Sequence, residues 1–149
     1  MTIRVDVQYI YEGASIPTRK QIKAWAEAAL QDLRKNAEFT VRIVDRQEGT
    51  ELNERWRQAT GPTNVLSFPA EGLEEIAPEL LGDIVICAPV IEDEAQQQGK
   101  TLDAHWAHMI VHGILHLLSY DHIKKQDAKI MESLEIKILE KIGYKNPYV

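Results

Sequence analysis

All five histidines of this 149-residue chain lie between His105 and His122, a clustering that random placement would rarely produce. In an α-helix, His112 and His116 lie one turn apart on one face, so both imidazoles can reach a common ion ~2.0–2.1 Å away. His122 can supply a third nitrogen if the chain turns back after Leu118. Three neutral imidazoles suit Zn²⁺ and leave its fourth position open for water, as in catalytic zinc sites. The stretch therefore predicts a single zinc ion per chain, held by His112, His116 and His122.

Three neighbouring residues have less specific interpretations. His105 and His108 come two turns and one turn before the predicted ligands, and we expect both to lie beside the ligands or in the cleft rather than on the metal. Asp121, next to His122, has two open interpretations. It either accepts a hydrogen bond that orients a ligand imidazole or forms a turn.

The spacing from His112 to His122 matches the ligands of H-E-x-x-H-x-x-G-x-x-H metalloproteases, but two positions differ. Gly113 stands where those enzymes carry the glutamate that takes a proton from the zinc-bound water. Glycine cannot do this, so it argues against peptide hydrolysis, and we expect it to leave a gap beside the metal for a bulky substrate group. Ser119 replaces the turn glycine, at a steric cost if that position is left-handed.

The residues from His112 to His122 read HGILHLLSYDH. They closely resemble the H-G-x-L-H-L-x-G-Y-D-H signature of the YbeY family, which comprises bacterial endoribonucleases and ribosomal RNA maturation factors. The clear departure is Ser119, where the family usually has glycine. Upstream and downstream segments are similar to other blocks of the family: Leu52-Asn53, Trp56-Arg57, residues 62–69 (PTNVLSFP), residues 82–86 (GDIVI) and the closing helix at 127–143.

The resemblance implies that His112, His116 and His122 hold zinc and that Arg57 lines the same cleft. It also implies a zinc-dependent endoribonuclease that cuts single-stranded RNA, notably small-subunit ribosomal RNA near its 3′ end. The family is further linked to ribosome quality control. Its implied partners are a small-subunit ribosomal protein and an assembly GTPase.

The chemistry of Arg57 and of a metal on His112 agrees with that reaction, and both residues are catalytic candidates. Zinc can lower the pKa of a bound water to ~7. The planar, always-charged guanidinium binds the non-bridging phosphate oxygens that gain charge in the transition state. Without the resemblance, Arg57 would read as a solvated helix arginine. No general base is evident, so the nucleophile is open between a metal-activated water and a 2′-hydroxyl group.

The formal net charge of −6 excludes a basic coat over the whole surface, so RNA binding requires a locally basic cleft. We expect that cleft to form where several arginines converge: Arg42, Arg46, Arg55 and Arg57. If they are scattered, one alternative gains, a ribosome-docking module with a structural zinc. The other alternative is a metallopeptidase-like zinc hydrolase.

Cys87 is the single cysteine of the chain, which fits a reducing compartment. The N-terminus lacks the apolar core of a signal peptide, and no apolar run approaches the roughly 20 residues that span a bilayer. We therefore expect a cytoplasmic protein with no membrane partner.

Hydrophobic periodicity predicts one α+β domain over residues 1–149, a four-stranded mixed sheet covered by about five helices, with the metal site on a long helix and the following turn. Its order of strands cannot be read. We expect strands at 3–9, 39–44, 65–68 and 82–87, the last buried on both faces. Helices are expected from Thr18 to near Asn36, from Thr50 through Arg57, and at 90–98, 102–118 and 127–142. The acidic run Glu92–Glu94 is expected to be a solvated helix start.

Metal analysis tests the three-histidine site directly. Protein purified without chelator should carry about one zinc ion per chain, measured by plasma mass spectrometry, because three imidazoles bind zinc tightly. His112→Ala, prepared in the same way, is the control for adventitious metal. A wild-type protein without metal would contradict the nuclease, the hydrolase and the docking module alike.

Overall fold

A four-stranded mixed sheet runs through the middle of the molecule, with the strand order β1-β2-β4-β3. The computed structural model describes residues 2–13, 15–120 and 125–149 as a single α+β domain. Three strands are parallel, β1 (Thr2–Tyr9), β2 (Asn36–Val44) and β4 (Leu80–Cys87), whereas β3 (Val65–Pro69) runs antiparallel to β4. Parallel neighbours need crossover connections, and helices supply them.

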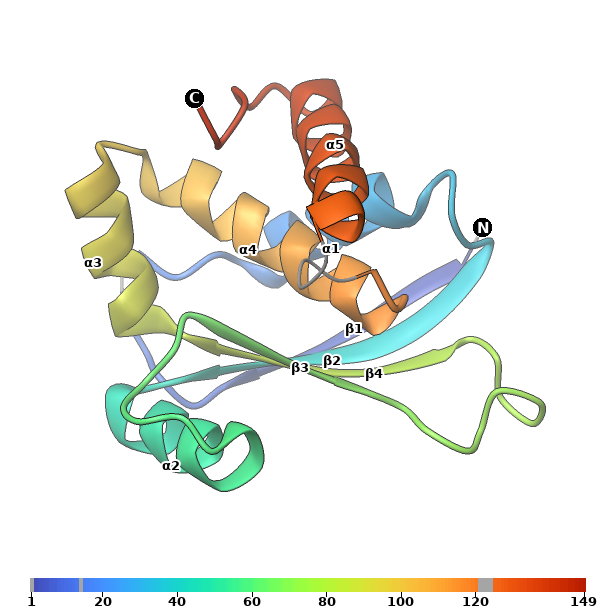
Figure 1. Ribbon diagram of the computed structural model, residues 1–149, viewed down its shortest axis with the longest axis horizontal. Helices are drawn as coiled ribbons and strands as arrows, with labels where there is room; N and C mark the ends of the chain where they lie inside the picture. The colour runs from blue at the N-terminus through green and yellow to red at the C-terminus, as the bar shows by residue number, and fades with distance from the viewer. Residues whose placement is uncertain (1, 14, 121–124) are drawn as a thin grey trace.

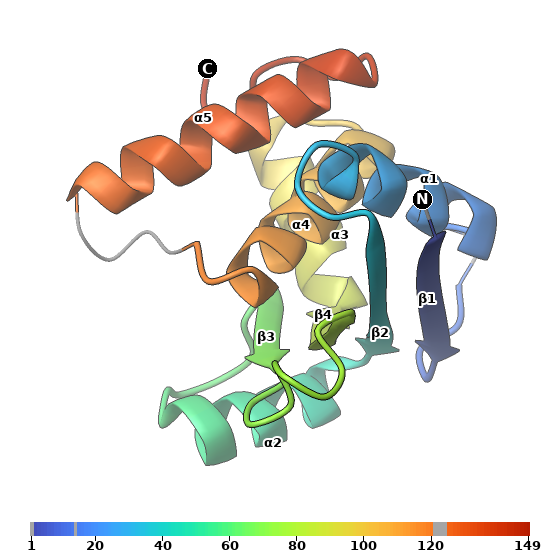
Figure 2. The same cartoon turned by 90° about the vertical axis from the view of Figure 1, so that its right-hand side faces the viewer.

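Helices cover the two faces of the sheet unequally (Figure 1). One face carries α1 (Arg19–Leu30), α3 (Ala88–Gln98) and α4 (Leu102–Leu117), and α5 (Lys125–Lys141) packs on α4 and α1 farther from the sheet. The other face carries α2 (Arg46–Arg57), which Figure 2 shows on the opposite side of the sheet from α5. None of the helices in the described ranges combines the length and the apolar character needed to cross a bilayer.

Strand β4 is buried on both faces, as its apolar sequence predicts. Ile84 and Ile86 belong to the main core on the α4 side. Val85 and Cys87 belong to a smaller cluster on the α2 side, which includes Leu52. Asp83 is the exposed exception in this strand.

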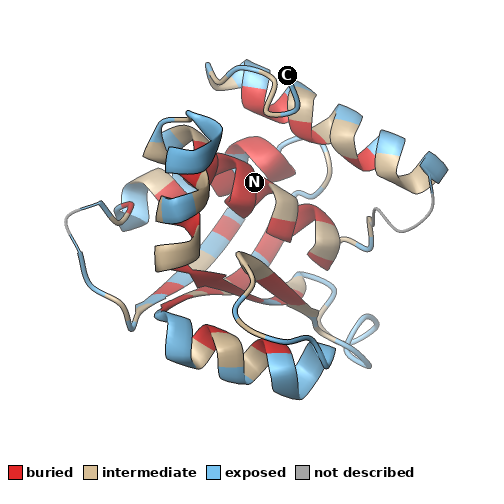
Figure 3. Cartoon of the chain, turned by 60° about the vertical axis from the view of Figure 1, so that its left-hand side comes forward, coloured by how far each residue is buried: buried red, intermediate tan, exposed pale blue. Residues whose placement is uncertain are grey.

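Helix α4 is the most deeply buried helix, and Figure 3 shows its length mostly in the colour of buried residues. Trp106, Ile110 and Ile114 are fully buried in the core. Thr101 caps the N-terminus, because its hydroxyl accepts a hydrogen bond of 3.1 Å from the N–H of Ala104. Because core contacts hold α4 along its length, its histidine side chains project in fixed directions.

Gly113 brings α4 into close contact with the sheet. A Cβ at this position would lie 3.0 Å from Cγ2 of Ile84, closer than ordinary packing allows. The Gly113 carbonyl also accepts a hydrogen bond of 3.1 Å from the hydroxyl of Ser67 in β3. The expected gap beside the metal is therefore wrong, because Ile84 fills the space next to the glycine.

Helix α4 ends in a Schellman motif. The N–H of Ser119 donates to the carbonyl of His116, and the N–H of Tyr120 donates to that of Leu115, both at 3.0 Å. Ser119 is left-handed, with φ +73°, so the serine carries the steric cost that the sequence suggested. The next residues, from position 121 to 124, lie outside the described part of the chain.

Two helix boundaries differ from prediction. The first helix ends at Leu30, and Asn36 instead opens β2, where its pairing with β1 decides the conformation. The second helix begins at Arg46, well before Thr50, because Asp45 accepts a hydrogen bond of 2.9 Å from the N–H of Glu48 and so caps an earlier turn.

The acidic run at residues 92–94 is also placed differently from prediction. Helix α3 begins at Ala88, so the run falls in its second turn rather than at its start. Asp93 forms an ion pair with Arg46, and Glu94 is partly buried. The expectation of a solvated helix start is therefore wrong.

Ser119→Gly should raise the free energy of unfolding by about 0.5–1 kcal/mol, since glycine relieves the left-handed strain but loses more entropy on folding. For a chain of this length, that corresponds to an increase in Tm of roughly 1–4 °C in thermal denaturation. The matched control is Gly99→Ser, because Gly99 is the exposed left-handed residue (φ +66°) that ends α3. Gly99→Ser should lower the free energy of unfolding by a similar amount. Equal stability of Ser119→Gly and wild type would show that the serine is not strained.

Candidate metal centre

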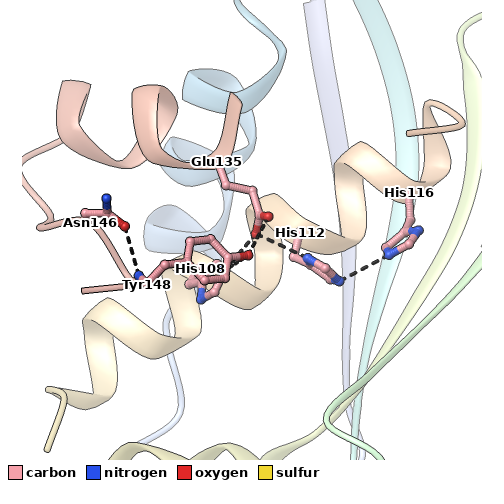
Figure 4. Close-up of polar contacts among 6 residues, drawn as sticks. All are labelled: His108, His112, His116, Glu135, Asn146 and Tyr148. Carbon is pink, nitrogen blue, oxygen red and sulfur yellow. Dashed lines mark hydrogen bonds and ion pairs between the residues drawn. The ribbon is translucent and has the colours of Figure 1, made fainter. Parts of the chain in front are cut away.

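His112 and His116 face each other across one turn of α4 (Figure 4). Their Nε2 atoms lie 3.1 Å apart. Two nitrogens bound to one tetrahedral zinc ion are separated by about 3.3 Å, so this pair has nearly the spacing of two ligands. At this distance the pair forms an N–H···N hydrogen bond when one nitrogen carries a proton, and it has the spacing to hold an ion when neither does.

The third predicted ligand, His122, and its neighbour Asp121 lie outside the described residues. His112 and His116 themselves line a cavity of about 690 Å³. The structure thus brings together two of the three predicted ligands, at the wall of an open space.

Glu135 of α5 holds the far side of the His112 ring. Its Oε2 lies 3.2 Å from Nδ1 of His112 and 2.7 Å from Nε2 of His108, and its Oε1 accepts a hydrogen bond of 2.7 Å from the hydroxyl of Tyr148. The Glu135 side chain is 1% exposed. Burial alone raises the pKa of Glu135, but the hydrogen bonds from His108, His112 and Tyr148 outweigh it and lower the pKa to about 2. It is therefore an ionised carboxylate inside the protein.

This carboxylate decides which ring nitrogens carry protons. An ionised carboxylate only accepts, so Nδ1 of His112 and Nε2 of His108 must each donate to it. Neutral His112 then has its lone pair on Nε2, the atom that faces His116. Nδ1 of His108 is buried without a hydrogen-bond partner among the described residues, so Nε2 is the ring nitrogen that pairs with Glu135.

A second metal arrangement is also compatible with the distances. His108, His112 and Glu135 each offer one ligand atom, and these atoms lie within 4.8 Å of one another, so the group could bind a metal ion. The contact of 2.7 Å between His108 and Glu135 has the length of a hydrogen bond, whereas two zinc ligands stand about 3 Å apart or more.

Arg57, in the last turn of α2, lines the same cavity as His112 and His116. Its Nη2 donates to the backbone carbonyl of Ser67, and its guanidinium lies 5.5 Å from the ring centroid of Phe68. The cavity is therefore lined both by the two histidines and by an arginine that β3 holds in place.

The four arginines that were expected to converge are scattered. Three of them make other contacts: Arg42 with Glu48, Arg46 with Asp93, and Arg55 with the ring of Trp56. Among the described residues that line the cavity, Arg57 is the only arginine or lysine, and Glu71 is an acidic neighbour. The expectation that these arginines converge on one cleft is wrong, because neighbouring carboxylates bind Arg42 and Arg46.

A second network links α4 to the cavity wall. Nε2 of His105 lies 2.9 Å from Oε1 of Glu94, and the two Glu94 oxygens lie 3.2 and 3.3 Å from Nδ2 of Asn64. Asn64 lines the cavity just before β3. Burial lowers the pKa of His105, and its hydrogen bond to Glu94 opposes this only in part. Neutral His105 therefore donates to Glu94 and helps to hold the cavity wall.

Sequence reasoning missed Glu135, Glu94 and Tyr148. A signal for Glu135 was available, because it falls between Met131 and Leu139 on the buried stripe of α5. A carboxylate at such a core position is almost always paired. Tyr148 carries no comparable signal, since it lies in a short tail after the last helix.

A sequence model of the family described as Endoribonuclease YbeY matches residues 8–143. The chain belongs to the YbeY family. Its relatives include the endoribonucleases YbeY of two Coxiella burnetii strains, Dugway and Nine Mile, each 49% identical over 150 residues and 98% of both chains. A solution structure of a Thermotoga maritima protein has a TM-score of 0.60 at 25% identity, over 95% of this chain and 91% of that one.

The YbeY match covers the whole cavity. Arg57, His112, His116 and Glu135 all fall inside the matched residues, whereas Tyr148 lies beyond them. The similarity to the YbeY family is therefore not confined to the histidine motif and extends over nearly the whole chain.

Proposed function

We propose that this YbeY protein is a zinc-dependent endoribonuclease that cuts single-stranded RNA in the cytoplasm. Its role would be maturation of small-subunit ribosomal RNA near the 3′ end, and ribosome quality control. The observation that supports the proposal is a single cavity lined by Arg57, His112 and His116. Membership of a family of endoribonucleases supports the same activity.

His112, His116 and His122 would hold one zinc ion. The imidazoles of the described pair, with Nε2 atoms 3.1 Å apart, fit such an ion in both ligand type and spacing. When bound, zinc supplies a Lewis acid that polarises phosphoryl oxygen and water.

The protein's own groups orient the substrate. Arg57, held in place by the Ser67 carbonyl, has further N–H groups with which to bind the non-bridging oxygens of the scissile phosphate. These oxygens gain charge in the transition state, so the interaction strengthens as the reaction proceeds. Because Arg57 and the histidines line one cavity, a phosphate bound there would be within reach of both.

A second candidate function is a docking module for the ribosome, with a structural zinc. The scattered arginines and the net charge of −6 favour it, because the cleft neutralises few phosphates by itself. On either function, a small-subunit ribosomal protein or an assembly GTPase would help to deliver the RNA. The metallopeptidase alternative is weaker, because position 113 is packed on Ile84 and carries no carboxylate.

A cleavage assay on a small-subunit ribosomal RNA fragment, run with and without chelator and beside a peptide substrate, tests the proposal. Arg57→Ala should slow RNA cleavage by about 10²–10³-fold with zinc still bound, by analogy with the loss of one transition-state donor. His112→Ala should abolish cleavage and lower the zinc content.

The matched control is Arg55→Ala, because Arg55 lies on the same helix and contacts Trp56 instead of the cavity. It should cleave like wild type. Equal activities of the two arginine variants would remove Arg57 from the mechanism. Binding to small ribosomal subunits without RNA cleavage would instead support the docking module.

A further inference from the structure

The geometry points to a hydrogen-bonded clamp in which Tyr148 holds Glu135, and Glu135 fixes the proton and direction of His112 for metal binding. Glu135, Tyr148 and His108 are then positioning residues rather than ligands. The inference rests on the proposed zinc site at His112 and His116. It assigns a role to a C-terminal tail that lies beyond the residues matched by the family model.

The chain reverses after α5 to bring Tyr148 back to the site. Gly143 is left-handed, with φ +91°, and the N–H of Tyr144 donates to the carbonyl of Leu139 at 2.9 Å. The side chain of Asn146 then accepts a hydrogen bond of 2.9 Å from the N–H of Tyr148. This turn places the Tyr148 hydroxyl against Glu135, as Figure 4 shows.

Both oxygens of Glu135 are already engaged. Oε1 accepts from Tyr148, and Oε2 accepts from His108 and His112. Desolvating a carboxylate is costly, and these donors compensate for it. A metal bound at Glu135 would have to displace the protons that make the carboxylate stable here. The cluster is therefore complete as a hydrogen-bond network, which favours a positioning role.

The clamp acts on the metal through His112. Because Glu135 accepts from Nδ1, the His112 ring keeps its lone pair on Nε2, directed toward His116. Carboxylates that hold ligand histidines in this way raise metal affinity, and their loss typically weakens binding 10–100-fold. Tyr148 acts one step further away, by holding the Oε1 edge so that Oε2 stays directed at the two rings.

Zinc affinity of the full chain, measured by competition with a chromophoric chelator, tests the clamp. Glu135→Gln should bind zinc 10–100-fold more weakly than wild type, because an amide cannot accept all three hydrogen bonds. Tyr148→Phe should bind zinc about fivefold more weakly than wild type, which corresponds to the free energy of one hydrogen bond. The matched controls are Glu140→Gln, an exposed glutamate of α5, and Tyr144→Phe in the same tail, and both should bind like wild type.

A second measurement needs no metal. The ¹⁵N chemical shifts of the His112 imidazole should show a proton on Nδ1 in wild-type protein and a mixture of tautomers in Glu135→Gln. A merely structural role for Glu135 would alter the melting temperature without altering this tautomer. Tyr148→Phe keeps the buried carboxylate and so remains informative if Glu135→Gln fails to fold.

Three results would overturn the clamp. The first is zinc affinity equal to wild type in both Glu135→Gln and Tyr148→Phe. The second is zinc binding that is abolished by His108→Ala and Glu135→Gln but kept by His116→Ala, which would make Glu135 a ligand. The third is an unchanged His112 tautomer in Glu135→Gln. If wild-type protein binds no zinc, the proposed function fails, and the tautomer still decides the clamp.

Discussion

The close approach of α4 to the sheet at Gly113 determines where the rest of the site lies. With no side chain at this position, Ile84 packs directly on the helix backbone. Ser67 then links Arg57 to α4, because its hydroxyl donates to the Gly113 carbonyl and its own carbonyl accepts from Arg57. One residue of β3 thus sets the position of Arg57 relative to the histidine helix. A larger residue at position 113 would shift α4 relative to the sheet, and the linked Ser67 and Arg57 would shift as well.

Helix α4 carries polar rings through a hydrophobic core, and its neighbours supply their partners. His105 is paired with Glu94 of α3, and His108 and His112 with Glu135 of α5. A buried ring nitrogen without a partner is costly, so these contacts restrict how α3 and α5 can pack on α4. The same hydrogen bonds that offset the cost of burying these rings also fix the tautomer of His112. Packing and chemistry therefore depend on one set of contacts.

Local sequence patterns were enough to predict the elements but not the contacts between them. The alternation in β1, the apolar run of β4 and the histidine spacing of α4 are properties of neighbouring residues, and the structure confirms the strands and the long helix. The left-handed Ser119 was also foreseeable from its place after the helix. Glu135 meets His108 across 27 residues, so only the packing of α5 on α4 brings them together. The prediction that Arg42 and Arg46 line the cleft failed for the same reason, because the fold determines which carboxylates they meet.

The charge balance of the cavity bears on how RNA would reach it. Arg57 and Glu71 offset each other on the described wall, and the chain as a whole is acidic. Long-range attraction of a polyanion is weak for such a surface, so rapid capture of RNA from solution by electrostatic steering is not available. A divalent ion on His112 and His116 would add positive charge only over short distances, where a phosphate is already in the cavity. On the proposed function, RNA would therefore be held by short-range contacts within the cavity, and long-range attraction would contribute little.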